Sequence, residues 1–250
     1  MITTYPNVLS NQSTLASPWA MQVARGKVDG ASQVNIFAFN TNVGTSLIPV
    51  WENATAYTFP ASALTMTLVS TSASDNSTAQ VVISGLTTGY VAVSETVALN
   101  GVTGVTTVNT YLRINSMVLT VAGSGQITNV GTITAKNGAT TYAQINVGIG
   151  KTQMSIYSVA AGSTMYALNI NAFQGDSASG YVNYRIQSRI DTGPQLTVLQ
   201  TTFRQSYQVL RANPFPYPEK SDIQWQFSVN TGTHAVGFIL EGVLISNSAA

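Results

Sequence analysis

The feature that most restricts the fold of this chain is an alternation of apolar and polar residues with a period of two. In "ALTMTLVS" (63–70), Leu64, Met66 and Leu68 alternate with threonine and other residues, and "DIQWQFSVN" (222–230) repeats the pattern. Successive side chains of a β-strand point to opposite faces of its sheet, so this period predicts half-buried strands. No long segment has the 3.6-residue period of an amphipathic helix. The sequence therefore predicts an all-β protein.

Turn signals between the predicted strands suggest how the chain is divided. Asn137-Gly138, between two alternating segments, is a strong hairpin signal. We expect two β-sandwich domains, over residues 31–136 and 137–250, joined near residues 136–150. The second has about eight predicted strands, which is the strand number of a jelly roll.

Two proline-containing segments interrupt the alternation. Residues 1–30 contain Pro6 and Pro18 and have no sustained period, so we expect an N-terminal arm that either reaches a neighbouring subunit or frays as an ordinary terminus. "NPFPYPEK" (213–220) has three prolines in eight residues and predicts an extended loop.

The chain carries little charge. Charged residues make up 8% of its 250 residues, against roughly 25% in an average soluble domain. Because 44% are hydrophobic, a packed core is expected rather than disorder. The net charge is only +1 and lysines are few. A free monomer with such a surface would be poorly protected against association. We therefore expect partner subunits to cover much of the surface; a neutral, threonine-rich extracellular domain is the alternative.

Several classes of partner are not expected. The chain has no cysteine, which excludes disulfides and thiolate metal sites. Its first residues lack the basic start and apolar run of a signal peptide, and no apolar run is long enough to span a membrane. The basic residues are too sparse for a nucleic-acid surface. We therefore expect no membrane and no nucleic-acid partner.

No catalytic, cofactor or metal site is expected either. "NVGIGKTQ" (146–153) ends like a phosphate-binding loop, but Ile145 replaces its first glycine and no helix is predicted after Lys151. The single histidine, His234, is expected to be a turn residue. The nine carboxylates show no paired signature, although a glycosidase is not excluded because a fold can bring distant carboxylates together. We expect a non-enzymatic protein.

The few charged residues are the candidates for contacts between subunits. Arg185 and Arg189 share one face of a predicted strand, and Arg204 follows on the next. "PEKSD" (218–222) could form an ion pair between subunits or a solvated local pair. The candidate subunit-contact residues are Arg25, Lys27, Arg185, Arg189, Arg204, Glu219, Lys220 and Asp222.

Aromatic residues keep a carbohydrate-binding module open as an alternative, because such rings can stack on sugars. Trp225 and Tyr184 fall on the apolar period and are expected in the core. Trp51 and Tyr57 flank a predicted loop, and we expect Trp51→Ala to abolish glycan binding if such a module exists.

Longer stretches resemble a known family. "WENATAYTFPASALTMTLVSTSASDNSTAQVVISGL", "SETVALNGVTGVTTVNTYLRINSMVLTVAG", "YSVAAGSTMYAL" and "PFPYPEKSDIQW" resemble virion structural proteins of tailed phages of cyanobacteria and other aquatic bacteria. The resemblance covers roughly residues 45–245. Ala161 departs from the family, which often has proline there.

The resemblance implies a component of the virion, made in the cytoplasm of a bacterial host. The leading hypothesis is a capsid cement or decoration protein, a homotrimer that contacts sister subunits and other virion proteins such as the major capsid protein. The alternative is a tail, neck or baseplate component that contacts the host.

Overall fold

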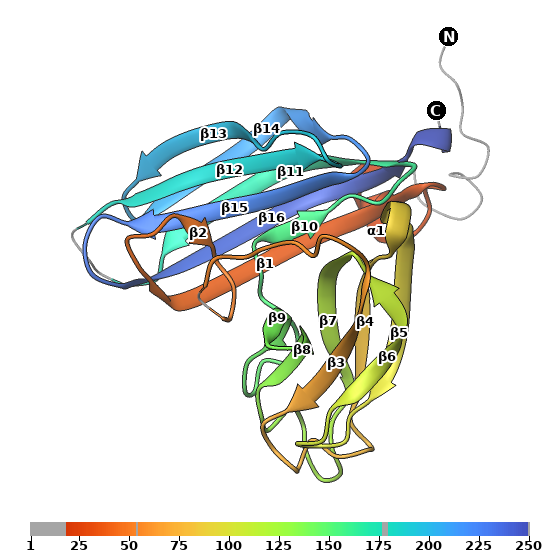
Figure 1. Ribbon diagram of the computed structural model, residues 1–250. Helices are drawn as coiled ribbons and strands as arrows, with labels where there is room; N and C mark the ends of the chain where they lie inside the picture. The colour runs from red at the N-terminus through yellow and green to blue at the C-terminus, as the bar shows by residue number, and fades with distance from the viewer. Residues whose placement is uncertain (1–18, 54, 177–179, 250) are drawn as a thin grey trace, which may run out of the picture.

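The computed structural model describes residues 19–53, 55–176 and 180–249. Strands β1 to β16 form four antiparallel sheets, and the helical elements in the described part are short: α1 (Trp19–Ala24), η1 (Thr88–Tyr90) and η2 (Asn247–Ala249). The predicted all-β fold is confirmed. Figure 1 shows two β-sandwiches, the smaller of which lies below the long strands of the larger one.

The larger sandwich contains the long strands near both ends of the described chain. Its strands are β1 (Ala31–Val43), β10 (Ile156–Ser158), β11 (Ser163–Gln174), β12 (Val182–Ile190), β13 (Leu196–Phe203), β14 (Ser206–Tyr217), β15 (Ser221–Val229) and β16 (His234–Ser246). One sheet has the order β1-β16-β11-β14 and the other β10-β15-β12-β13, and the short strand β2 (Ile48–Pro49) also pairs with β15.

This strand order is that of a jelly roll. Among the eight main strands, the first pairs with the last, the second with the seventh, the third with the sixth and the fourth with the fifth. Such pairing describes one long antiparallel hairpin rolled up into two facing sheets.

Large aromatic side chains fill the space between the two sheets. Trp225 stacks on Phe238 with ring centroids 5.3 Å apart, and Tyr184 stacks on Phe227 at 4.9 Å. All four side chains are fully buried. Trp225 and Tyr184 therefore lie in the core, as their place in the alternation predicted.

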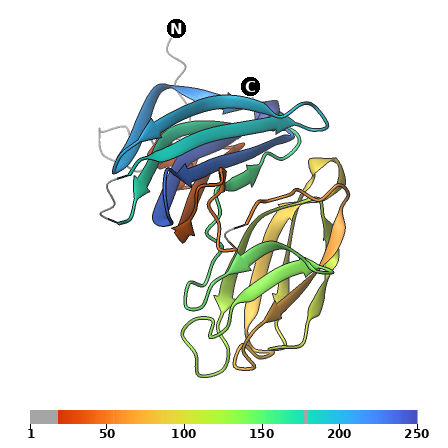
Figure 2. The same cartoon turned by 60° about the vertical axis from the view of Figure 1, so that its left-hand side comes forward.

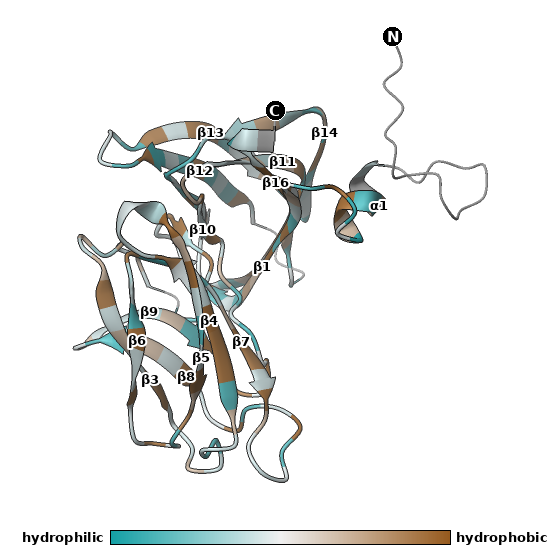
Figure 3. Cartoon of the chain, turned by 90° about the vertical axis from the view of Figure 1, so that its right-hand side faces the viewer, coloured by the Kyte–Doolittle hydropathy of each residue, from teal (hydrophilic) through white to brown (hydrophobic). Residues whose placement is uncertain are grey.

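The smaller sandwich is inserted into the jelly roll between its first and second strands, with only β2 in between. It consists of β3 (Leu64–Ser70), β4 (Gln80–Leu86), β5 (Ala92–Ala98), β6 (Val105–Tyr111), β7 (Arg113–Val121), β8 (Ile133–Asn137) and β9 (Thr140–Ile145). Its sheets have the orders β6-β3-β8-β9 and β5-β4-β7. We call it the inserted domain; Figure 2 shows it beside the jelly roll, and Figure 3 shows apolar and polar residues interspersed along its strands.

The strands do not divide at the expected boundary near residues 136–150. β1 pairs along its length with β16 and shares its core. The predicted Asn137-Gly138 turn does form, with Gly138 at φ 58°, but it joins β8 to β9 inside the inserted domain. The chain crosses between the domains near Val50 and again near Ser155.

The two proline-containing segments also differ from expectation. Residues 1–18 of the expected arm lie outside the described residues, while α1 lies against β1 and buries Val23. Pro214 and Pro216 belong to β14 rather than to a loop. β14 is the outer strand of its sheet, a position that tolerates proline because one side of the strand needs no ladder hydrogen bonds.

Candidate functional site

The two segments that connect the domains are bonded to each other and to the jelly roll. The Val50 amide donates to Ser155 Oγ at 2.8 Å, and the Ser155 amide donates to the Val50 carbonyl at 2.8 Å. Ser155 Oγ in turn donates to the Trp225 carbonyl at 2.6 Å. All three residues are buried, so the two crossings form a single ordered junction.

An ion cluster next to this junction joins the domains. Arg113, at the start of β7, donates from Nε and Nη2 to the two carboxylate oxygens of Asp222 on β15, both at 2.6 Å. Asp222 also accepts from Arg189 Nη2 at 2.8 Å, from the Tyr90 hydroxyl at 3.1 Å and from Ser158 Oγ at 2.7 Å. We call these five residues the Asp222 cluster.

Burial and pairing set the electrostatics of the Asp222 cluster. Burial alone would lower the pKa of Arg113, but the hydrogen bonds and negative charge of Asp222 outweigh it and raise that pKa. Burial, followed by the charge of Asp222, raises the pKa of Tyr90 to about 12. The Arg113 guanidinium also lies 4.8 Å from the ring centroid of Phe59. The cluster therefore contains a buried ion pair between Arg113 and Asp222, which suits a structural connection between the domains.

The polar face of β15 is buried, although its alternation predicted solvent exposure. Asp222, Gln224, Gln226 and Ser228 are all buried on the side opposite the aromatic core. Gln224 Nε2 donates to the Tyr57 carbonyl at 3.4 Å. The segment leading into the inserted domain thus lies against Gln224 on this face.

A second buried carboxyl, that of Glu52, lies at the junction. The Gln153 amide donates to its Oε1, whereas its Oε2 has no hydrogen-bond partner among the described residues. Burial raises the pKa of Glu52 to about 8, opposed by backbone hydrogen bonds. Glu52 is therefore mainly protonated at neutral pH.

The eight candidate subunit-contact residues do not form one patch. Asp222 and Arg189 are brought together, but inside a single subunit. Asp222 is 2% exposed, so it is not available for an ion pair between subunits. Arg185 donates to Gln226 Oε1 at 2.9 and 2.6 Å.

The remaining candidates lie at turns and strand ends. Glu219 accepts the Gly162 amide at 2.6 Å, and Lys220 has a φ of 61° in the tight turn before β15. Arg25 and Lys27 follow α1, and Arg204 lies in the turn between β13 and β14; all three are exposed. These three arginine and lysine side chains stay open to a partner.

The aromatic residues expected as a sugar platform are in the core. Trp51 is 1% exposed and Tyr57 8%, and their rings meet edge to face at 5.3 Å. Trp51 Nε1 donates to the Thr55 carbonyl at 2.7 Å. The alternative in which Trp51 stacks on a glycan is therefore not supported, because its ring is buried.

The residues tested for catalysis are found in structural roles. Lys151 forms an isolated β-bridge with Val118, and no helix begins at it. The sequence Gly150-Lys151-Thr152 therefore belongs to a turn and not to a phosphate-binding loop. His234, at the start of β16, pairs with Asp176 at 3.0 Å on the surface. In the described ranges, no three His, Cys, Asp or Glu side chains gather to hold a metal ion, and no helix there is long and apolar enough to cross a membrane.

Asp75 organises the loops at the far end of the inserted domain. It is fully buried. Its carboxylate accepts the Ser70 hydroxyl at 2.5 Å and the amides of Val130 and Gly131 at 2.8 and 2.9 Å. These bonds tie the loop after β3 to the loop before β8.

We expect Asp75→Ala to lower the free energy of unfolding by about 1–3 kcal/mol, because two amides and a hydroxyl lose a charged acceptor. Urea unfolding measures the loss, and amide hydrogen exchange should rise at residues 128–132. Asp29→Ala, at an exposed turn residue, is the matched control. Equal, small effects of both substitutions would show that Asp75 does not hold the loops.

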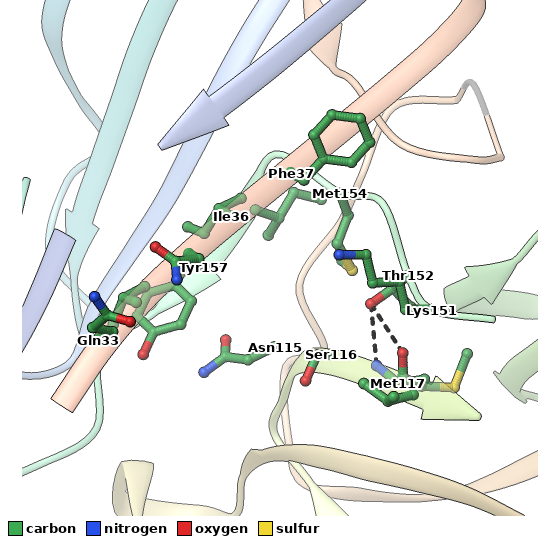
Figure 4. Close-up of a pocket in the computed structure, with 14 residues that line it drawn as sticks. Gln33, Ile36, Phe37, Asn115, Ser116, Met117, Lys151, Thr152, Met154 and Tyr157 are labelled. Atoms are coloured by element: carbon green, nitrogen blue, oxygen red, sulfur yellow. Dashed lines mark hydrogen bonds between the residues drawn. The ribbon is translucent and has the colours of Figure 1, made fainter. Parts of the chain in front are cut away.

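An interdomain cleft of about 310 Å³ opens at the junction. One wall is β1, with Gln33, Asn35 and Phe37, and the opposite wall includes Ser116 on β7 and Lys151. In Figure 4, Gln33 and Tyr157 lie toward one end of the cleft, and Phe37 and Lys151 toward the other. No motif marks these residues, because the cleft exists only where two domains meet.

Comparisons with known proteins give limited information. No protein-family model matches the chain, and no curated protein matches its sequence. Among solved structures, infectious bursal disease virus, Gt strain, is 10% identical over 93% of this chain and 79% of that chain, with a TM-score of 0.23. T=1 particles derived from infectious bursal virus are 9% identical over 89% and 71%, with a TM-score of 0.22. The infectious bursal disease virus VP2 subviral particle is 12% identical over 88% and 73%, with a TM-score of 0.21. Scores this low do not establish a common fold.

Proposed function

We propose that this chain is a non-enzymatic structural protein of a phage virion, and specifically a capsid cement or decoration protein. It would act as a homotrimer that contacts sister subunits and other virion proteins such as the major capsid protein. The observation that carries the proposal is an apolar open edge on a surface of very low charge. The family resemblance in the sequence supports a place in the virion.

The open edge consists of β13 and β14, the outer strands of the two jelly-roll sheets. Leu210 is 80% exposed, Leu196 60% and Val198 36%. Neither strand contains a lysine, and the prolines of β14, Pro214 and Pro216, lie near its C-terminal end, beyond Leu210. An edge of this kind is suited to pairing with a second copy of the chain, whose surface carries equally little charge.

A substitution at the open edge tests this mode of assembly. We expect the full chain to sediment as an oligomer, and Leu210→Arg to shift it toward monomer by placing a charge in an apolar contact. Val108→Arg is the matched control, because Val108 is 92% exposed but lies on β6 of the inserted domain. A monomeric parent chain, or an oligomer that survives Leu210→Arg unchanged, would contradict the proposal.

The inserted domain favours a second candidate, a tail, neck or baseplate protein that contacts the host. Its far loops are tied together by Asp75 and expose Ile127 completely. Quantitative mass spectrometry of purified virions separates the candidates: cement predicts hundreds of copies per particle, and a tail or neck protein a few to dozens.

A further inference from the structure

The walls of the interdomain cleft carry polar groups with unused hydrogen-bonding capacity. The side-chain amides of Gln33 and Asn35 and the hydroxyls of Ser116 and Tyr157 make no hydrogen bond to the described residues. None of the four is fully buried. Amides and hydroxyls can both donate and accept, so these groups suit a ligand that is rich in hydroxyl groups.

The charge of the cleft argues for an uncharged ligand. No carboxylate or histidine lines it, so it offers no ligand set for a metal ion and no counter-ion for a cation. Its single charged residue is Lys151, whose Nζ lies 6.0 Å from the ring centroid of Phe37. The partly exposed rings of Phe37 and Tyr157 add apolar surface. Hydroxyl groups and apolar faces together are the chemistry of sugars.

The shape of the cleft argues for an extended ligand. A second hollow of about 430 Å³ shares Asn115, Ser116 and Tyr157 with the first, and it too is lined without charged residues. The Asn115 side chain is held in place, since its Nδ2 donates to the Ser158 carbonyl and its Oδ1 accepts the Ser158 amide, both at 2.9 Å. The two hollows thus adjoin at residues that include the fixed Asn115 side chain. Each has a volume within the usual range of ligand pockets, about 300–1,000 Å³.

We propose that this interdomain cleft binds a neutral, linear oligosaccharide. Gln33, Asn35 and Ser116 would bond its hydroxyl groups, and the rings of Phe37 and Tyr157 would contact its apolar faces. This site differs from the sugar platform expected at Trp51, which is buried. It does not depend on the proposed role in the virion, because the cleft belongs to a single chain.

The test is a titration of the ¹⁵N-labelled full chain with neutral disaccharides: maltose, cellobiose, lactose and diacetylchitobiose. We expect at least one to give saturable amide shifts in residues 33–37, 115–118 and 151–157, with a Kd of about 0.1–5 mM. The double variant Gln33→Ala/Asn35→Ala should weaken that binding about tenfold or more. Both side chains are exposed and unbonded, so this variant should fold like the parent.

Gln200→Ala is the matched control, because Gln200 is an exposed amide on β13, outside the cleft; its binding should equal that of the parent. Tyr157→Phe, which removes one hydroxyl, should weaken binding without changing the fold. No shifts with any of the four sugars, or shifts confined to other residues, would overturn the proposal. Glucuronic acid is titrated as a charged comparison. If it bound and none of the four neutral sugars did, the assignment to neutral sugars would be overturned.

Discussion

Asp222→Asn is expected to lower the free energy of unfolding by about 3–5 kcal/mol, because it leaves the buried Arg113 guanidinium without its counter-charge. The amide nitrogen of the new side chain would also face donors where a carboxylate oxygen now accepts. The loss is measured by urea unfolding at pH 7, followed by tryptophan fluorescence. Because Arg113 and Asp222 come from different domains, the substitution should also raise hydrogen exchange at the junction.

The control for this prediction is Asp191→Asn, the same chemical change at an exposed turn residue, which should alter stability by less than about 0.5 kcal/mol. The double variant Arg113→Met/Asp222→Leu removes both charges and should be more stable than Asp222→Asn. Equal effects of Asp222→Asn and Asp191→Asn would show that the Asp222 cluster contributes little to the union of the domains.

The stability of the parent chain is expected to fall as the pH rises through the range set by Glu52. The pKa of Glu52 is about 8 in the folded protein, above its ordinary value of 4.5. The folded state therefore binds this proton more tightly than the unfolded state. This contribution is fully present below about pH 4.5 and is lost as the pH rises through about 8.

Glu52→Gln removes this titration while keeping an oxygen to accept the Gln153 amide. We expect the variant to be more stable than the parent by about 2–4 kcal/mol at pH 9 and to show a flatter pH profile. Urea unfolding from pH 5 to pH 9 measures both. Glu241→Gln, at an exposed residue, should leave the profile of the parent unchanged. An identical pH profile for Glu52→Gln and the parent would contradict this account.

Local patterns predicted the strands well, because the spacing of apolar residues within each strand indicates which of its faces is buried. In β15, Ile223, Trp225 and Phe227 face the core as the alternation predicted. The same alternation was misleading for the opposite face. Gln224 is covered by a segment far away in the sequence, since it bonds to the Tyr57 carbonyl. A period of two distinguishes the two faces of a strand but does not show what covers them.

The insertion was not predictable for a related reason. Strands of both domains show the same alternation of apolar and polar residues, so the alternation does not mark the crossings near Val50 and Ser155. The Asn137-Gly138 turn was read correctly as a hairpin but lies within one domain. That β1 pairs with β16 is a contact between the ends of the described chain, which no local signal reports.

The Asp222 cluster was recognised only in part. Asp222 and Arg189 were selected as charged residues, but for contacts between subunits. Arg113 was not among the candidates, although it lies between the apolar residues Leu112 and Ile114. In a chain with only ten basic residues, a single arginine between apolar neighbours is a usable signal for a buried ion pair.

The most direct test of the proposed function is to label intact phage particles with gold-conjugated antibodies against this protein and to view them by electron microscopy. The cement proposal predicts label spread over the whole head. Label confined to the tail or neck would contradict it and would direct attention to the loops around Ile127 as the attachment surface. Absence of label from head and tail alike, with the protein missing from the dissociated particles, would contradict a role in the virion altogether.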